Sequence, residues 1–124
     1  MTRTILTAIF LTLFSQTAWG DNLAEVQLVS KSDDQRGYCI DIRGHKEHAK
    51  VQRGFQAHTC HSYQGQIGVD QAFDASPVAT RIFFLPAFDA CMEAENISQG
   101  SRLILSGCAE HNLQKFDLNS ANEI

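Results

Sequence analysis

The chain has 124 residues, with 10 Lys and Arg against 14 Asp and Glu, and a formal net charge of -4. This length predicts one domain, because domains usually contain about 100–150 residues. The acidic balance argues against a nucleic-acid-binding surface, which needs clustered positive charge, and beyond the N-terminus no apolar run reaches the ~18 residues of a membrane span.

The first twenty residues have the pattern of a signal peptide. Arg3 supplies a positive charge, residues 5–14 (ILTAIFLTLF) are apolar, and Ala18 and Gly20 are small residues at positions -3 and -1 of a cleavage site. We therefore expect cleavage after Gly20, a mature domain of residues 21–124, and a secreted or periplasmic protein. The alternative is a short N-terminal anchor that stays attached.

The rest of the chain reads as short strands in two similar units, about residues 24–74 and 75–118. Residues 24–30 (AEVQLVS) alternate between apolar and polar side chains, and residues 80–85 (TRIFFL) are rich in β-branched and aromatic residues. After these, YCIDIRG…FQAHTC…DQAF in the first unit matches ACMEAEN…LILSGC…LQKF in the second. We expect four strands in each unit, an all-β fold, and no helices of note.

Four cysteines lie within the two units: Cys39, Cys60, Cys91 and Cys108. In an exported protein an even number of cysteines favours disulfides. Three pairings are open, and the spacing alone does not choose among them. Their order along the repeat suggests one bridge in each unit, Cys39–Cys60 and Cys91–Cys108, each stabilising the fold by about 3 kcal/mol.

The repeated pattern resembles the ricin-type β-trefoil lectin family. The shared signature is a Cys-x-Asp strand, a second strand ending in Cys, and a closing Gln-x-aromatic, here Gln71-x-Phe73 and Gln114-x-Phe116. The resemblance covers about residues 24–118 and implies a β-trefoil-like fold that binds carbohydrate. The family closes its barrel with three units, whereas two are present here. We therefore expect a partial trefoil, either a compact two-unit form or one completed by a second copy as a homodimer, or a part of a larger complex.

The resemblance places one candidate sugar site in the first unit. Asp41 stands where the family has its hydroxyl-binding carboxylate, and His58 stands where it has its stacking aromatic. The full set expected to bind carbohydrate is Asp41, Gln56, His58, Asp70 and Gln71. Gln71 has an equally good alternative role, hydrogen bonding to backbone within its repeat.

The second unit lacks this pattern. Glu93 replaces the aspartate, Ile104 falls at the glutamine position, and Ser106 falls at the aromatic position. We expect the second unit to be structural. The ligand implied by the resemblance is a glycan of galactose type, bound without catalysis and without a cofactor.

Parts of the sequence also fit two other chemistries, metal binding and acid–base catalysis. His45-x-x-His48 and His58-x-Cys60-His61 have spacings found in metal sites, but no four-ligand set is evident, and no metal is expected. Asp41 and His58 could act as an acid and base pair, but no nucleophile lies in a known motif, so the chain is not expected to be an enzyme. The alternative function is a disulfide-stapled scaffold for protein interaction that has lost sugar binding.

Overall fold

The computed structural model describes residues 22–121 and 123–124. The predicted signal peptide, residues 1–20, lies outside the described residues. Within the described part the regular structure is short β-strands and 3-10 turns, with no α-helix, and no helix there is long and apolar enough to cross a membrane. The prediction of an all-β chain is confirmed at this level.

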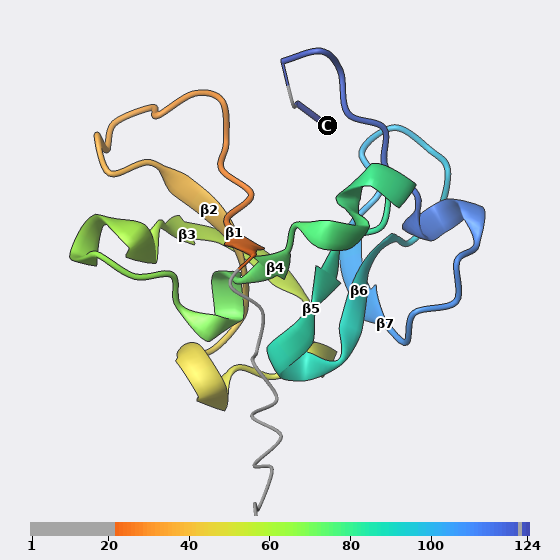
Figure 1. The fold of residues 1–124 in the computed structure, drawn as a ribbon, viewed down its shortest axis with the longest axis horizontal. Helices are drawn as coiled ribbons and strands as arrows, with labels where there is room; N and C mark the ends of the chain where they lie inside the picture. The colour runs from red at the N-terminus through yellow and green to blue at the C-terminus, as the bar shows by residue number, and fades with distance from the viewer. Residues whose placement is uncertain (1–21, 122) are drawn as a thin grey trace, which may run out of the picture.

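The first unit contains four strands: β1 (Leu23–Ala24), β2 (Tyr38–Ile42), β3 (Phe55–Thr59) and β4 (Phe73–Asp74). The strands β2 and β3 form an antiparallel hairpin, and β1 pairs with β4. The second unit contains β5 (Phe84–Leu85), β6 (Ala90–Ala94) and β7 (Leu103–Ser106). The pairs β5–β6 and β6–β7 are antiparallel, and β4 pairs with β5, which joins the two units (Figure 1).

The repeat predicted from the sequence is visible in the strand register. Cys39 lies opposite His58 in the first hairpin, and Cys91 lies opposite Ser106 in the second. Each hairpin is followed by a 3-10 turn that contains the closing glutamine, Val69–Gln71 in the first unit and Asn112–Gln114 in the second. The two halves therefore share one plan, although a complete β-trefoil is not shown.

Two predicted strands are shorter than expected. Residues 24–30 provide only the end of β1 and an isolated bridge from Gln27 to Cys39, although the backbones of Val26 and Leu28 still hydrogen bond to β2. Residues 80–85 provide β5 at their C-terminal end, because Ser76–Thr80 forms a 3-10 turn with a proline in its first turn. The fourth strand of the second unit is reduced to a bridge between Ile82 and Lys115.

Both predicted disulfides are present. Cys39–Cys60 joins β2 to the residue after β3, and Cys91–Cys108 joins β6 to the segment after β7, with Cα–Cα distances of 4.9 and 5.1 Å. No cysteine in the described residues is free. In each unit one disulfide joins the hairpin to the segment that leads to the closing turn.

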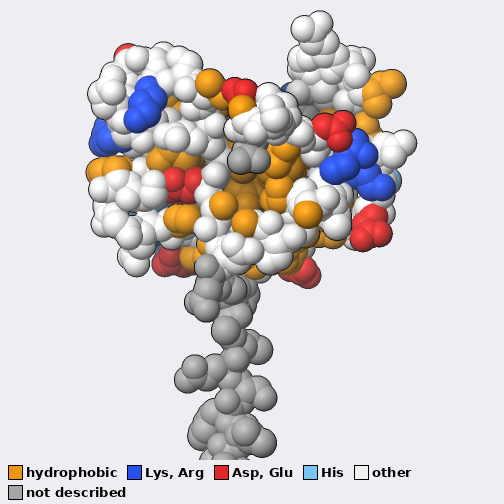
Figure 2. Space-filling view, turned by 45° about the horizontal axis from the view of Figure 1, so that its top comes forward, with side chains coloured by type: hydrophobic (Ala, Val, Ile, Leu, Met, Phe, Trp, Pro, Cys, Tyr) orange, Lys and Arg blue, Asp and Glu red, His pale blue; other side chains and the backbone are white. Residues whose placement is uncertain are grey.

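The core is apolar, and a hollow lies beside it. Phe73 packs edge-to-face against Phe83, which packs in the same way against Phe116, with ring centroids 6.1 and 6.0 Å apart. Beside these rings is a hollow of about 660 Å³ (the apolar hollow), and Figure 2 shows apolar side chains gathered in it. Its walls include Val26, Leu28, Ile40, Phe73, Phe83 and Leu118. In the described part of the chain, the two units therefore leave a hollow beside the core, although Phe73 and Phe83 are themselves buried.

Candidate functional site

The β2–β3 hairpin provides the first part of the site. Its register sets Asp41 opposite Gln56 and Cys39 opposite His58, and residues opposite one another in an antiparallel pair project to the same face. The Cys39–Cys60 bridge fixes the end of this hairpin. Alternation along β3 places Gln56 and His58 on one face, as the sequence predicts, and the β2–β3 register adds Asp41 to that face.

Asp41 is the centre of the cluster, and only 1% of its surface is exposed. One carboxylate oxygen, Oδ2, accepts a hydrogen bond from Gln71 Nε2 at 3.3 Å and lies 3.7 Å from His58 Nδ1. The other oxygen, Oδ1, is buried and has no hydrogen-bond partner among the described residues. Burial raises the pKa of the Asp41 carboxyl, while the amides of Gln56 and Gln71 lower it by a smaller amount.

A second buried carboxylate, that of Asp70, lies in the closing turn with 1% of the residue exposed. Its Oδ2 accepts the backbone N–H of Lys46 at 3.0 Å, and its Oδ1 lies 3.6 Å from His61 Nε2. Like Asp41, Asp70 has its Oδ1 buried without a hydrogen-bond partner in the described structure. The negative charge of Asp70 also contributes to the raised pKa of Asp41.

Gly68 makes the close approach of Asp70 to His61 sterically feasible. A Cβ atom at this position would lie 2.7 Å from His61 Cδ2 and 2.9 Å from Asp70 Oδ1, closer than real Cβ atoms come to other atoms. The position therefore requires glycine, because any side chain would push the two groups apart.

Gln71 acts as an anchor inside the first unit. It is fully buried, its Oε1 accepts the backbone N–H of His61 at 2.8 Å, and its Nε2 donates to the carbonyl of Thr59 at 3.0 Å. These bonds hold the segment that follows β3 against the closing turn. They match the backbone-bonding role that the sequence left open for Gln71.

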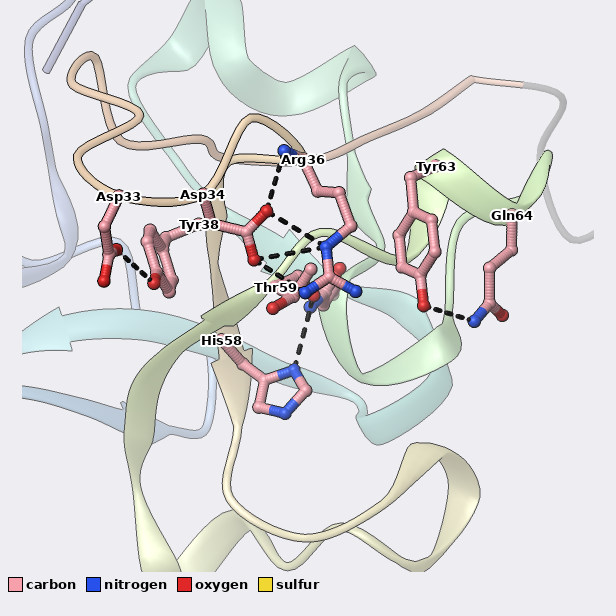
Figure 3. Close-up of polar contacts among 9 residues, drawn as sticks. Asp33, Asp34, Arg36, Tyr38, His58, Thr59, Tyr63 and Gln64 are labelled. Atoms are coloured by element: carbon pink, nitrogen blue, oxygen red, sulfur yellow. Dashed lines mark hydrogen bonds and ion pairs between the residues drawn. The ribbon is translucent and has the colours of Figure 1, made fainter.

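An exposed ion pair and an aromatic ring lie near the hairpin (Figure 3). Arg36 pairs with Asp34 through Nη2–Oδ2 at 2.7 Å and Nε–Oδ1 at 3.0 Å, and its guanidinium lies 5.1 Å from the centre of the Tyr63 ring. His58 faces the Thr59 carbonyl through Nδ1 at 3.3 Å. The half-exposed Tyr63 ring is thus engaged by Arg36.

The other four residues predicted to bind carbohydrate lie around Asp41, but the five differ in accessibility. The side chain of His58 is 55% exposed and Gln56 is half-buried, whereas Asp70 and Gln71 are buried. One member of the cluster was not in the predicted set: His61, whose ring stacks against that of His58 with centroids 6.0 Å apart. Its only sequence signal was the His58-x-Cys60-His61 spacing.

The second unit repeats the anchor but not the cluster. Gln114 Oε1 accepts the backbone N–H of Ala109 at 2.9 Å, and its Nε2 donates to the carbonyl of Gly107 and to Glu93 Oε2, each at 2.8 Å. His111 Nε2 lies 3.3 Å from the same glutamate oxygen. Glu93 Oε2 is therefore bonded to the closing glutamine, as Asp41 Oδ2 is bonded to Gln71 in the first unit.

Comparisons of this chain with protein families, with curated proteins and with solved structures find no match. The resemblance to the ricin-type lectins therefore stays a prediction that depends on the motifs and on the geometry described above.

Proposed function

We propose that this protein is an exported, non-catalytic carbohydrate-binding module of the lectin type, with one site in the first unit. The proposed site consists of Asp41, Gln56, His58, Asp70 and Gln71. Asp41, Gln56 and His58 contact the ligand, whereas the buried Asp70 and Gln71 support them from beneath. The proposed compartment is extracellular or periplasmic, and the two disulfides fit such an oxidising environment.

The observation that carries this proposal is the spare acceptor oxygen of Asp41. A sugar ring presents neighbouring hydroxyl groups, and a carboxylate is a stronger acceptor for them than a neutral group is. Asp41 Oδ1 has no hydrogen-bond partner among the described residues, although the Gln56 amide acts on this carboxyl strongly enough to lower its pKa. Because this oxygen is buried, a hydroxyl reaches it only when the side chains above it move. The corresponding Glu93 has its Oε2 already bonded to Gln114.

His58 supplies the surface beside this acceptor. Its ring is half-exposed, and its Nδ1 lies 3.7 Å from Asp41 Oδ2. The imidazole then offers a flat face to the sugar, and Gln56, opposite Asp41 in the hairpin, offers an amide. The galactose type implied by the resemblance is the first glycan class to test.

The test compares the purified, disulfide-bonded protein with Asp41→Ala and Glu93→Ala variants on a broad glycan array. Asp41→Ala removes the spare acceptor, and Glu93→Ala is the matched control in the second unit. We expect glycan binding by the wild type, its loss in Asp41→Ala, and its retention in Glu93→Ala, with circular dichroism showing that all three are folded. Absence of glycan binding by the folded wild type would overturn the proposal.

The alternative function, a scaffold for protein interaction, is favoured by one specific observation, the apolar hollow. Open apolar surface of this kind is often covered by a partner in solution. A second copy of the chain, as in the predicted homodimer, or a different protein in a larger complex would serve as that partner. A folded protein that binds no glycan would make this scaffold function the one to pursue.

A further inference from the structure

We propose that Asp41, His58 and His61 form a binding site for a divalent transition-metal ion of the zinc class. Each of these residues offers one ligand atom, and the three atoms lie within 4.8 Å of one another. Ligand atoms around a tetrahedral zinc ion lie about 3.3 Å apart, given zinc–nitrogen bonds of about 2.0 Å. To coordinate one ion, the three atoms must approach one another by up to about 1.5 Å, through rotation of the two histidine rings.

The unpartnered carboxylate oxygens provide independent evidence for a cation. Asp41 and Asp70 are both 1% exposed, and each keeps its Oδ1 buried without a described hydrogen-bond partner. An unsatisfied buried charged group is costly, and proteins keep such groups where a partner or an ion completes them. A metal ion held by Asp41 would satisfy the first of these oxygens and would neutralise the charge that Asp70 adds nearby.

The types of ligand select the class of metal. Two imidazoles and one carboxylate suit zinc and related transition metals, whereas calcium and magnesium prefer sites made only of oxygen ligands. Three protein ligands leave the fourth position of a tetrahedral ion free. His58, with 55% of its side chain exposed, places the proposed site at the protein surface.

The surrounding structure already holds the ligands in place. The Cys39–Cys60 bridge links β2, which carries Asp41, to the segment that carries both histidines. Gln71 binds the backbone N–H of His61, and Asp70 lies 3.6 Å from the His61 ring. A carboxylate next to a ligating histidine orients its ring and increases its basicity.

The metal site does not depend on sugar binding. The two proposals share Asp41 and His58, but His61 belongs to the metal site alone. The second unit, which has Glu93, Ser106 and Ala109 at the corresponding positions, lacks the histidine pair and serves as an internal comparison.

The experiment is a calorimetric titration of the chelator-treated, purified protein with Zn²⁺ in the absence of glycan. We expect one ion per chain, and a loss of affinity of at least about tenfold in both His61→Ala and His58→Ala. His58 is exposed, so its replacement keeps the test valid even if His61→Ala folds poorly. His48→Ala and His111→Ala are the matched controls and are expected to bind as the wild type does.

A second measurement locates the ion directly. In ¹⁵N NMR spectra of the histidine side chains, Zn²⁺ should shift the ring nitrogens of His58 and His61 and leave those of His111 unchanged. Absence of binding, or binding that survives both His58→Ala and His61→Ala, would overturn the proposal. A protein that binds Zn²⁺ but no glycan would retain this site while the lectin function fails.

Discussion

The two units of this protein share a hairpin, a disulfide and a closing glutamine. They differ in what surrounds the carboxylate on the first strand of each hairpin, Asp41 in β2 and Glu93 in β6. In the first unit Asp41 is buried beside two histidines and has a spare oxygen. In the second unit Glu93, whose side chain is 13% exposed, is bonded to Gln114 and lies beside a single histidine, His111. The shared features build the fold, and both proposed sites depend on the features found only in the first unit.

The largest expected effect concerns the features that the units share. Replacing either cysteine pair with serine should lower the free energy of unfolding by about 3 kcal/mol, since both loops are of similar length, 21 and 17 residues. Loop length alone makes the two losses differ by only about 0.2 kcal/mol. Urea denaturation of the two double variants measures both losses.

The same two variants distinguish the units by function. Loss of the Cys39–Cys60 bridge should also abolish ligand binding, because it frees the segment that carries His58 and His61. Loss of the Cys91–Cys108 bridge should leave binding intact under conditions where the variant is folded. Equal impairment of binding in both variants would show that the site is not confined to the first unit.

An intermediate effect is expected at the two anchoring glutamines. Gln71→Ala and Gln114→Ala each remove a buried amide and leave backbone groups unpaired, which costs about 1–3 kcal/mol. Gln71→Ala should cost more, because the carboxylate that loses its amide, Asp41, is more buried than Glu93. Chemical denaturation at pH 7 measures the difference, and a larger loss for Gln114→Ala would contradict this ranking.

The smallest effect is the pH dependence contributed by Asp41. Burial raises the pKa of this carboxyl in the folded protein above its ordinary value of 3.8, so the folded state retains a proton at pH values where the unfolded state has lost it. The contribution of Asp41 to stability is therefore greatest in acid and declines as pH rises from 3.8 through the folded pKa.

Asp41→Asn should remove this decline, so that the variant gains stability relative to the wild type as pH rises through this range. The measurement is urea denaturation at several pH values in the presence of a chelator, with Glu93→Gln as the matched control. A difference between the wild type and Asp41→Asn that does not change with pH would show that the carboxyl does not titrate in this way.

The local pattern of the sequence was enough to predict part of the site. Asp41, Gln56 and His58 come together through the two-residue alternation of strands and the pairing of two neighbouring segments, both of which are local properties. The disulfides followed from the order of the cysteines in the repeat. The strand lengths were less predictable, because the pairing of residues 24–30 depends on how far β2 runs beside them.

Other parts of the site depend on loops that the pattern does not describe. Asp70 meets the backbone of Lys46 because the segment after β2 turns back onto the closing turn, and Lys46 adopts a positive φ of 48° there. His61 reaches Asp70 because Gly68 leaves room for it. Both contacts combine residues from separate turns, whose conformations are set by packing.

The sequence by itself determined the two-unit repeat, the all-β character, the pairing suggested for the cysteines and the shared face of Gln56 and His58, because these depend on periodicity and order along the chain. Only the tertiary structure decided that Gln71 is an anchor, that His61 joins Asp41 and His58, and that the described residues leave the apolar hollow beside the core. These features arise where segments distant in sequence meet, and the free energy of such contacts depends on burial and distance in three dimensions.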